Sequence, residues 1–218
     1  MTEVFRNFIG EVKPIRFKEP LAEFLGAFQA RDGVLDYTFA DAVKMAGHAC
    51  PTVAGAYLCC QKAIEALYPV ALPDRGNIAV TVYGEPDEGV YGVMGQVFSF
   101  LTGAAPASGF RGLGHKFGRK DLLRFIPEKL DSRAMSFIFK RLDTGKAVLV
   151  KFYPQQIPFP ADKSRRMGEL MEKVLWEADR GNEKTEFQDL WTAKVKTMLI
   201  EQKDIENWLK IEAVEDLK

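Results

Sequence analysis

Two residues of the sequence combine types and spacing that suit metal or thiol chemistry. His48 and Cys50 lie two positions apart in the segment Gly47-His48-Ala49-Cys50-Pro51. Proline favours the first position of a helix, so the Cys50 sulfur is expected at a helix N-terminus. The unpaired amide groups and the positive dipole end of a helix stabilise a thiolate there. Cys50 would then be a metal ligand or a nucleophile, with His48 as second ligand or activating base. A buried thiol beside a histidine that caps the preceding helix is the alternative interpretation.

Of the remaining histidine and cysteines, only the histidine is a candidate for a further metal ligand beside this pair. His115 follows Gly114 in a glycine-rich loop over residues 103–118, where small residues permit close approach to a ligand or a partner chain, and it is a candidate third metal ligand. Basic residues of the same loop could hold an anionic group. Cys59 and Cys60 fall in the helix that Pro51 begins, about 13 to 15 Å from Cys50 along the axis, and are predicted to be core thiols.

The elements that must position these residues can be predicted from periodicity and capping. Apolar residues at helical spacing predict helices over 20–28, 38–45, 51–67 and 93–101, with Thr38 and Asp41 as a capping box. Alternating residues predict strands over 78–82, 136–142 and 147–153, the last two joined by a turn. We expect an α+β domain over residues 1–155, with an antiparallel or mixed sheet covered by helices.

A helical extension is predicted over residues 156–218. It contains a charged αα-hairpin, with helical stripes over 167–175 and 187–198. Residues 205–214 are expected to dock on the main body through Trp208 and Leu209.

Composition and charge narrow the classes of function. Lys and Arg number 30 and so do Asp and Glu, so the chain has no net positive field to attract nucleic acid. No apolar run approaches the length of a membrane helix, and the acidic first residues do not predict export. The odd count of 3 cysteines fits a reducing compartment, so we expect a cytoplasmic protein. From the charge balance and the short apolar runs we expect neither nucleic-acid nor membrane partners.

The string from Gly47 to Pro51, followed by Gly55, Ala63 and Leu67, resembles the FmdE family, proteins similar to one of the subunits of formylmethanofuran dehydrogenase. The order of the strand over 78–85, the helix over 93–103, the glycine-rich segment and the Gly145-Lys146 turn also matches that family. The resemblance implies a compact α+β homodimer with a zinc-type site that uses His48 and Cys50. A homodimer is also suggested by Phe98, Phe100, Leu101 and Phe110, which predict an apolar surface that a partner could cover.

The sequence departs from the family pattern at two expected ligands. Ala46 replaces the first histidine of the motif, and Val93 or a near neighbour replaces a later cysteine. Fewer protein ligands would leave open coordination positions, as in a catalytic or cofactor-binding site. Three functions therefore compete: a homodimeric metal-binding accessory or cofactor-binding protein, a metal- or thiol-dependent enzyme that uses Cys50 and His48, and an interaction subunit attached through the helical extension.

Overall fold

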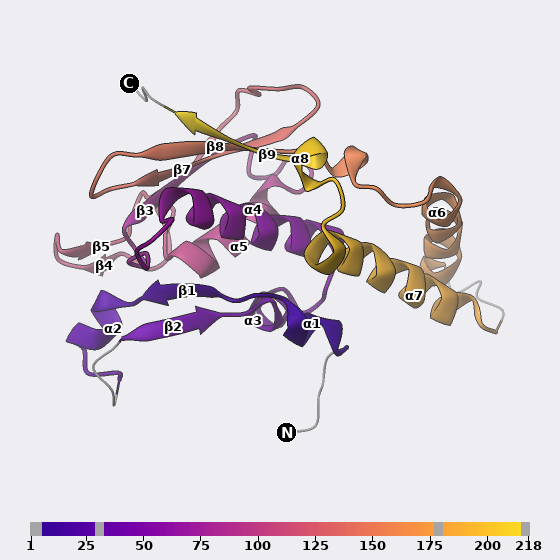
Figure 1. Cartoon of the computed structure of the whole chain (residues 1–218), viewed down its shortest axis with the longest axis horizontal. Helices are drawn as coiled ribbons and strands as arrows, with labels where there is room; N and C mark the ends of the chain where they lie inside the picture. Colours follow the sequence, from indigo (N-terminus) through magenta and orange to yellow (C-terminus); the bar gives the residue numbers. More distant parts are fainter. Residues whose placement is uncertain (1–5, 29–32, 177–180, 215–218) are drawn as a thin grey trace.

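The chain is described from a computed structural model over residues 6–28, 33–176 and 181–214. The first residues, on which the expectation of no export signal rests, lie outside these ranges. Within them the fold is α+β, as the sequence predicted, with helices and a mixed sheet (Figure 1). Among the described helices none is long and apolar enough to span a bilayer.

The main sheet has five strands in the order β6-β3-β7-β8-β9. Its strands are β3 (Ile78–Tyr83), β6 (Leu123–Ile126), β7 (Met135–Arg141), β8 (Ala147–Phe152) and β9 (Leu209–Val214). β6 runs parallel to β3, and every other neighbouring pair is antiparallel. The predicted hairpin over residues 136–153 corresponds to β7 and β8.

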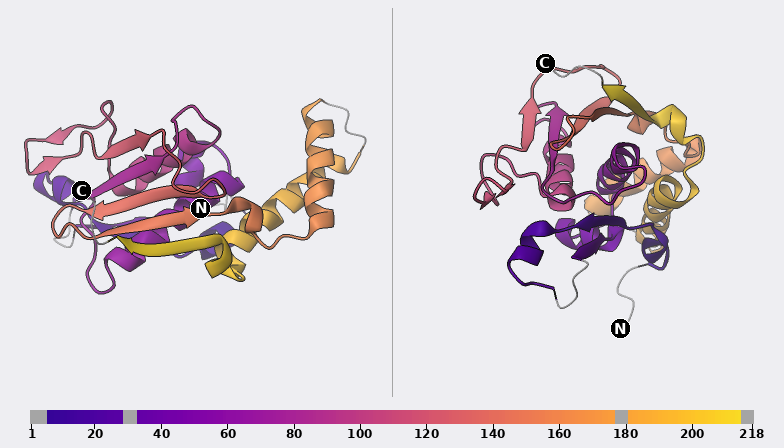
Figure 2. Two further views of the ribbon diagram at one scale, coloured as in Figure 1. Left: turned by 90° about the horizontal axis from the view of Figure 1, so that it is seen from above. Right: turned by 60° about the vertical axis from the view of Figure 1, so that its left-hand side comes forward.

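The central helix α4 (Pro51–Leu67) lies between the main sheet and an N-terminal layer (Figures 1 and 2). Of its 17 residues, 12 are buried, because both sides of the helix meet protein. Gly55 permits the close approach to β8, since a Cβ atom there would lie 2.8 Å from the Phe152 ring. A second helix, α5 (Tyr91–Thr102), packs beside α4 and begins slightly before the predicted Val93.

The N-terminal layer consists of short elements. These are α1 (Phe8–Glu11), β1 (Ile15–Lys18), α2 (Pro20–Phe24), β2 (Val34–Tyr37) and α3 (Phe39–Ala46), with β1 and β2 paired antiparallel. The predicted capping box is confirmed: the Asp41 backbone N–H donates to Thr38 Oγ1 at 3.2 Å, and the Thr38 N–H donates to the Asp41 carboxylate at 3.0 Å. It fixes the start of α3, the helix that leads to Gly47 and the His48 segment.

The predicted αα-hairpin is α6 (Ala161–Leu175) and α7 (Glu183–Lys196), which follow the short turn η1 (Pro154–Gln156). Seen from above, α6 stands away from the sheet and α7 leads back to it (Figure 2). α7 continues into a π-helical turn, η2 (Thr197–Glu201), and then α8 (Ile205–Trp208).

Residues 209–214 are not helical, in contrast to the helical extension predicted over 156–218. They form β9, because Leu209, Ile211 and Ala213 alternate with charged residues and the edge of β8 offers unpaired backbone groups. This confirms that the stretch from 205 docks on the body. The boundary at residue 155 stays a prediction, although β9 completes the main sheet.

Three further features differ from the sequence-based expectations. The glycine-rich loop contains a small hairpin, β4 (Gly112–Leu113) with β5 (Phe117–Gly118). α2 ends at Phe24 rather than Phe28. Phe98 and Leu101, expected on an apolar surface, are fully buried in the core, because α5 turns these residues toward the sheet and α4; only Phe110 of that set is strongly exposed.

Candidate functional site

Cys50 occupies the N-cap of α4, as its position before Pro51 predicts. Its extended backbone (φ −141°, ψ 165°) lets the Cys50 Sγ accept a hydrogen bond from the Val53 N–H at 3.4 Å. The side chain is buried. A sulfur held at this helix end lies beside backbone N–H groups, a position that metal-ligating and nucleophilic cysteines also occupy.

His48 lies outside the core, two residues earlier. Its Nδ1 is 2.9 Å from the Ala46 carbonyl oxygen, so in the neutral ring Nδ1 carries the hydrogen and Nε2 keeps its lone pair. A carbonyl that fixes the tautomer in this way is a common support for metal-ligating histidines. Ala46, at the position where the resemblance to the FmdE family predicts a histidine, contributes its carbonyl to this contact.

His115 is not brought to His48 within one chain. His48 lines a cavity of about 310 Å³ between α3 and α7, together with Val43 and Trp191. His115 is exposed in the β4–β5 hairpin and lines a different cavity of about 440 Å³, beside Asn77. Over residues 6–28, 33–176 and 181–214, no group of three His, Cys, Asp or Glu side chains is placed to hold a metal ion.

Cys59 and Cys60 are fully buried in α4, so the prediction of core thiols is confirmed. Burial raises the pKa of both thiols well above the ordinary value, because a thiolate would be desolvated there. Val93, where a family cysteine was expected, is an exposed residue of α5.

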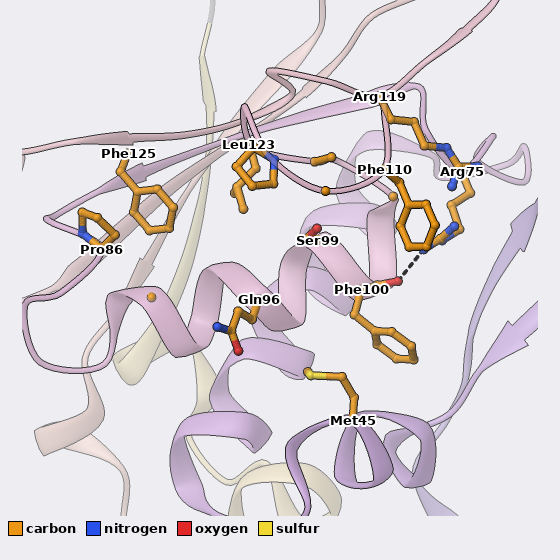
Figure 3. A pocket seen from close by; sticks show the side chains of 15 residues that line it. Met45, Arg75, Pro86, Gln96, Ser99, Phe100, Phe110, Arg119, Leu123 and Phe125 are labelled. Atoms are coloured by element: carbon orange, nitrogen blue, oxygen red, sulfur yellow. Dashed lines mark hydrogen bonds between the residues drawn. The ribbon is translucent and has the colours of Figure 1, made fainter. Parts of the chain in front are cut away.

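A larger cavity lies elsewhere, between α5 and the segment that follows it, and holds about 540 Å³. We call it the arginine cavity. Most of its wall is apolar, and polar atoms come mainly from two arginines and from Gln96 and Ser99 of α5 (Figure 3). Its lining residues are Met45, Arg75, Pro86, Gly92, Gln96, Ser99, Phe100, Gly103, Ala105, Pro106, Gly109, Phe110, Arg119, Leu123 and Phe125.

Arg75 and Arg119 share one carboxylate, that of Glu19. Arg75 Nη1 donates to Glu19 Oε2 at 2.9 Å, and Arg119 Nη2 donates to Glu19 Oε1. The side chains are 13%, 9% and 6% exposed for Arg75, Arg119 and Glu19. Two guanidinium groups and one carboxylate leave a net positive charge in a largely buried place, where water screens it weakly.

The two arginines differ in how fully their donors are used. Arg75 also donates to the carbonyls of Phe100 at 2.7 Å and Leu101 at 3.0 Å, at the C-terminal end of α5, whose dipole offsets part of its charge. Arg119 donates one hydrogen bond, to Glu19, and its other side-chain N–H groups have no partner in the described part of the chain. Spare donors on a nearly buried cation favour an anionic ligand.

The guanidinium of Arg119 packs closely against two glycines. A Cβ atom on Gly76 would lie 3.0 Å from Arg119 Nε, and one on Gly103 would lie 3.3 Å from Arg119 Nη1. Both glycines have positive φ (88° and 77°), a conformation that other residues rarely adopt. A side chain at either position would therefore crowd the guanidinium in the cavity wall.

The apolar part of the wall is rich in aromatic rings. Phe100 and Phe110 lie near the arginines, while Phe125 lies at the other end of the cavity, beside Pro86 (Figure 3). Phe110 is 85% exposed, an unusual state for a phenylalanine that lines a cavity. Flat apolar groups fit between such rings.

Arg119 directly follows the glycine-rich loop over residues 103–118 in the sequence, which does not reveal its neighbours Glu19 and Arg75 or the cavity. Arg119 and Glu19 are 100 residues apart, and Arg75 and Glu19 are 56 apart. One local signal exists: Glu19 continues the alternation of buried residues from Ile15 and Phe17, which points a carboxylate to the inner face.

Compared with known proteins, the chain matches no protein-family model, and no curated protein matches it either. The resemblance to the FmdE family therefore stays a prediction from the motif.

Proposed function

We propose that this protein binds a small organic anion with a flat apolar body, held in the arginine cavity. The observation that carries the proposal is Arg119, a nearly buried guanidinium with unused N–H donors in the wall of an apolar cavity. The acid of the ligand would accept from Arg119, and its body would lie among Phe100, Phe110 and Phe125.

Size and polarity support a small molecule as the occupant. Binding sites for such ligands typically hold about 300–1,000 Å³ and combine apolar walls with a few fixed polar groups. The arginine cavity, at about 540 Å³, has that size and composition. A planar guanidinium also matches a carboxylate better than an ammonium group would, because it offers parallel N–H donors.

The test compares 2-naphthoate with its neutral analogue 2-naphthalenemethanol by isothermal titration calorimetry. Naphthoate should bind more tightly than the alcohol. The Arg119→Met substitution should lower the affinity for naphthoate by roughly 10-fold to 100-fold, the effect of losing a hydrogen bond to a charged group. Binding of the alcohol should change little.

Arg111→Met is the matched control, because Arg111 belongs to the same loop, is exposed and does not line the cavity. It should leave both ligands unaffected. Equal affinity for acid and alcohol, or unchanged naphthoate binding in Arg119→Met, would refute the proposal.

A second function, favoured by the Cys50 geometry, is metal binding. We propose that Cys50 Sγ at the N-cap of α4 and His48 Nε2 hold a transition metal, zinc first, in a cytoplasmic FmdE-like homodimer. His115 of a partner chain would be a third ligand, since His115 of the same chain lines another cavity. If the open positions admit a substrate, the same pair would serve a metal- or thiol-dependent enzyme. Elemental analysis of protein purified without chelator tests this proposal.

A further inference from the structure

Lys194 of α7 lines a small cavity at the start of the central helix. The cavity holds about 80 Å³ and is also lined by Pro51 and Thr52 of α4, Met94 of α5 and Phe152 of β8. We call it the Lys194 cavity. It shares no lining residue with the arginine cavity, so a role for Lys194 is independent of the anion binding proposed for that cavity.

The Lys194 amino group has no acidic partner within the described residues. It lies near the Phe159 ring, whose centre is 6.0 Å from Nζ. Lys173, in the other helix of the hairpin, instead pairs with the Glu183 carboxylate at 2.6 Å. A half-buried ammonium without a counter-ion is unfavourable, because its charge is partly desolvated. Loss of a proton gives the neutral amine and removes that desolvation cost.

The surroundings favour the neutral amine for two reasons. Burial lowers the pKa of Lys194 from its ordinary value, because the charged form is desolvated. The cavity also includes the first residues of α4, where the helix dipole presents positive charge. A lysine in such a place keeps more of its nucleophilic form at neutral pH than a solvated lysine does.

We propose that the Lys194 cavity is a site for small aliphatic carbonyl compounds, with the Lys194 amine as nucleophile. The Nζ lone pair attacks the carbonyl carbon, the C=O electron pair moves to oxygen, and a proton passes from nitrogen to that oxygen to give a carbinolamine. Loss of water breaks the C–O bond and forms the C=N bond of an imine. The reaction consumes one carbonyl compound and releases one water, with no oxidant or reductant.

The lining fits the steps and limits the ligand. Thr52, the second residue of α4, lines the cavity at the positive end of that helix, a setting that stabilises negative charge on the carbonyl oxygen. The other walls are largely apolar. With a liquid water molecule occupying about 30 Å³, the volume admits a ligand of only a few non-hydrogen atoms.

The test is imine trapping on the full chain at neutral pH, with propionaldehyde and cyanoborohydride, followed by peptide mass spectrometry. Lys196 is the internal control, because it is an exposed lysine two residues along the same helix. Lys194 should be propylated roughly tenfold faster than Lys196, since more of its amine is neutral and the cavity holds the aldehyde beside it. With bulky 2-naphthaldehyde the preference for Lys194 should disappear.

A Lys194→Arg variant with an unchanged circular dichroism spectrum should lose the fast propylation at position 194. Slow propylation of Lys196 should remain. Propylation of Lys194 no faster than Lys196 would overturn the proposal. Equal preference for Lys194 with both aldehydes would also overturn it, because the amine would then be reactive without a cavity that selects small carbonyl compounds.

Discussion

Trp191 of α7 donates its indole N–H to the backbone carbonyl of Ala49, with a nitrogen–oxygen distance of 2.9 Å. The two residues are 142 positions apart. The bond ties the α6–α7 hairpin to the joint between α3 and α4, where His48 and Cys50 lie. The extension is thus linked to the motif segment rather than attached to the body only through β9.

Trp191→Phe should loosen this joint. The change removes the indole donor and leaves the Ala49 carbonyl without that partner, at a cost of about 1 kcal/mol in the free energy of unfolding. Hydrogen exchange should rise in residues 48–52, as measured by mass spectrometry, together with a lower urea midpoint. Trp176→Phe is the control, because Trp176 is 83% exposed on the same hairpin and should tolerate the change. Equal effects of both substitutions would contradict the role of the bond.

Glu19→Gln should be among the costly single substitutions. It leaves the buried guanidinium groups of Arg75 and Arg119 without their carboxylate, and breaking a buried ion pair in this way costs roughly 3–5 kcal/mol. Urea denaturation followed by circular dichroism measures the loss. Glu23→Gln, at an exposed position of α2, should stay within about 0.5 kcal/mol of the wild type. An exposed ion pair contributes at most roughly 1 kcal/mol to stability. If Glu19→Gln lowers the free energy of unfolding by less than about that amount, the arginines are already solvated.

Metal content should depend on the His48–Cys50 pair. We expect about one transition-metal ion per chain, and Cys50→Ser and His48→Ala should each lower the occupancy, because both are ligands in the proposed site. Inductively coupled plasma mass spectrometry on protein purified without chelator gives the number. Cys59→Ser is the control, since its buried side chain should affect stability rather than metal content. Wild-type occupancy in both ligand variants would exclude the site.

His115 should affect metal binding only through a second chain, because His115 and His48 line different cavities of one chain. We expect light scattering to give about twice the chain mass of 24.5 kDa. His115→Ala should weaken metal affinity by roughly 10-fold to 100-fold without unfolding, as the loss of a supporting interaction does. If light scattering gives a monomer at micromolar concentration, both the proposed homodimer and this role of His115 are refuted.

The buried thiols should make the fold sensitive to alkaline pH. Folding raises the pKa of Cys59 and Cys60, so between the unfolded value of about 8.5 and the folded value the native state holds more protons. Stability is therefore fully present below about pH 8.5 and falls as the pH rises above it, by up to about 1.4 kcal/mol per pH unit for each thiol.

Urea midpoints measured between about pH 8 and 10 test whether stability falls as the pH rises. This pH range is chosen because it begins just below the unfolded thiol pKa of about 8.5. The lowered pKa of Lys194 acts in the opposite direction, because the unfolded chain binds more protons there. The comparison is therefore made with Cys59→Ala/Cys60→Ala, whose stability should fall less steeply. An identical slope in this double variant would show that the thiols do not carry the effect.

Local features were predictable because their causes lie within a few residues. The Thr38–Asp41 capping box, the proline at the start of α4 and the alternation in β3 each depend on neighbours in the chain. The same holds for Cys50: its place before Pro51 sufficed to put the sulfur at a helix N-terminus. Strands as short as β4 and β6 were not predicted, because two to four residues are too few to establish a period. The alternation of Ile15 and Phe17 in β1 was present in the sequence but was overlooked.

The α+β class, the helices that frame His48 and Cys50, and the burial of Cys59 and Cys60 follow from the pattern of residues along the chain. Three other features are visible only in the folded chain: β9 completes the sheet, Glu19 joins Arg75 to Arg119, and Lys194 lines a cavity at the start of α4. These two groups of features differ in how far apart in the chain the interacting residues lie. Capping and periodicity act through adjacent backbone groups, whereas an ion pair or a cavity depends on which distant segments packing brings together.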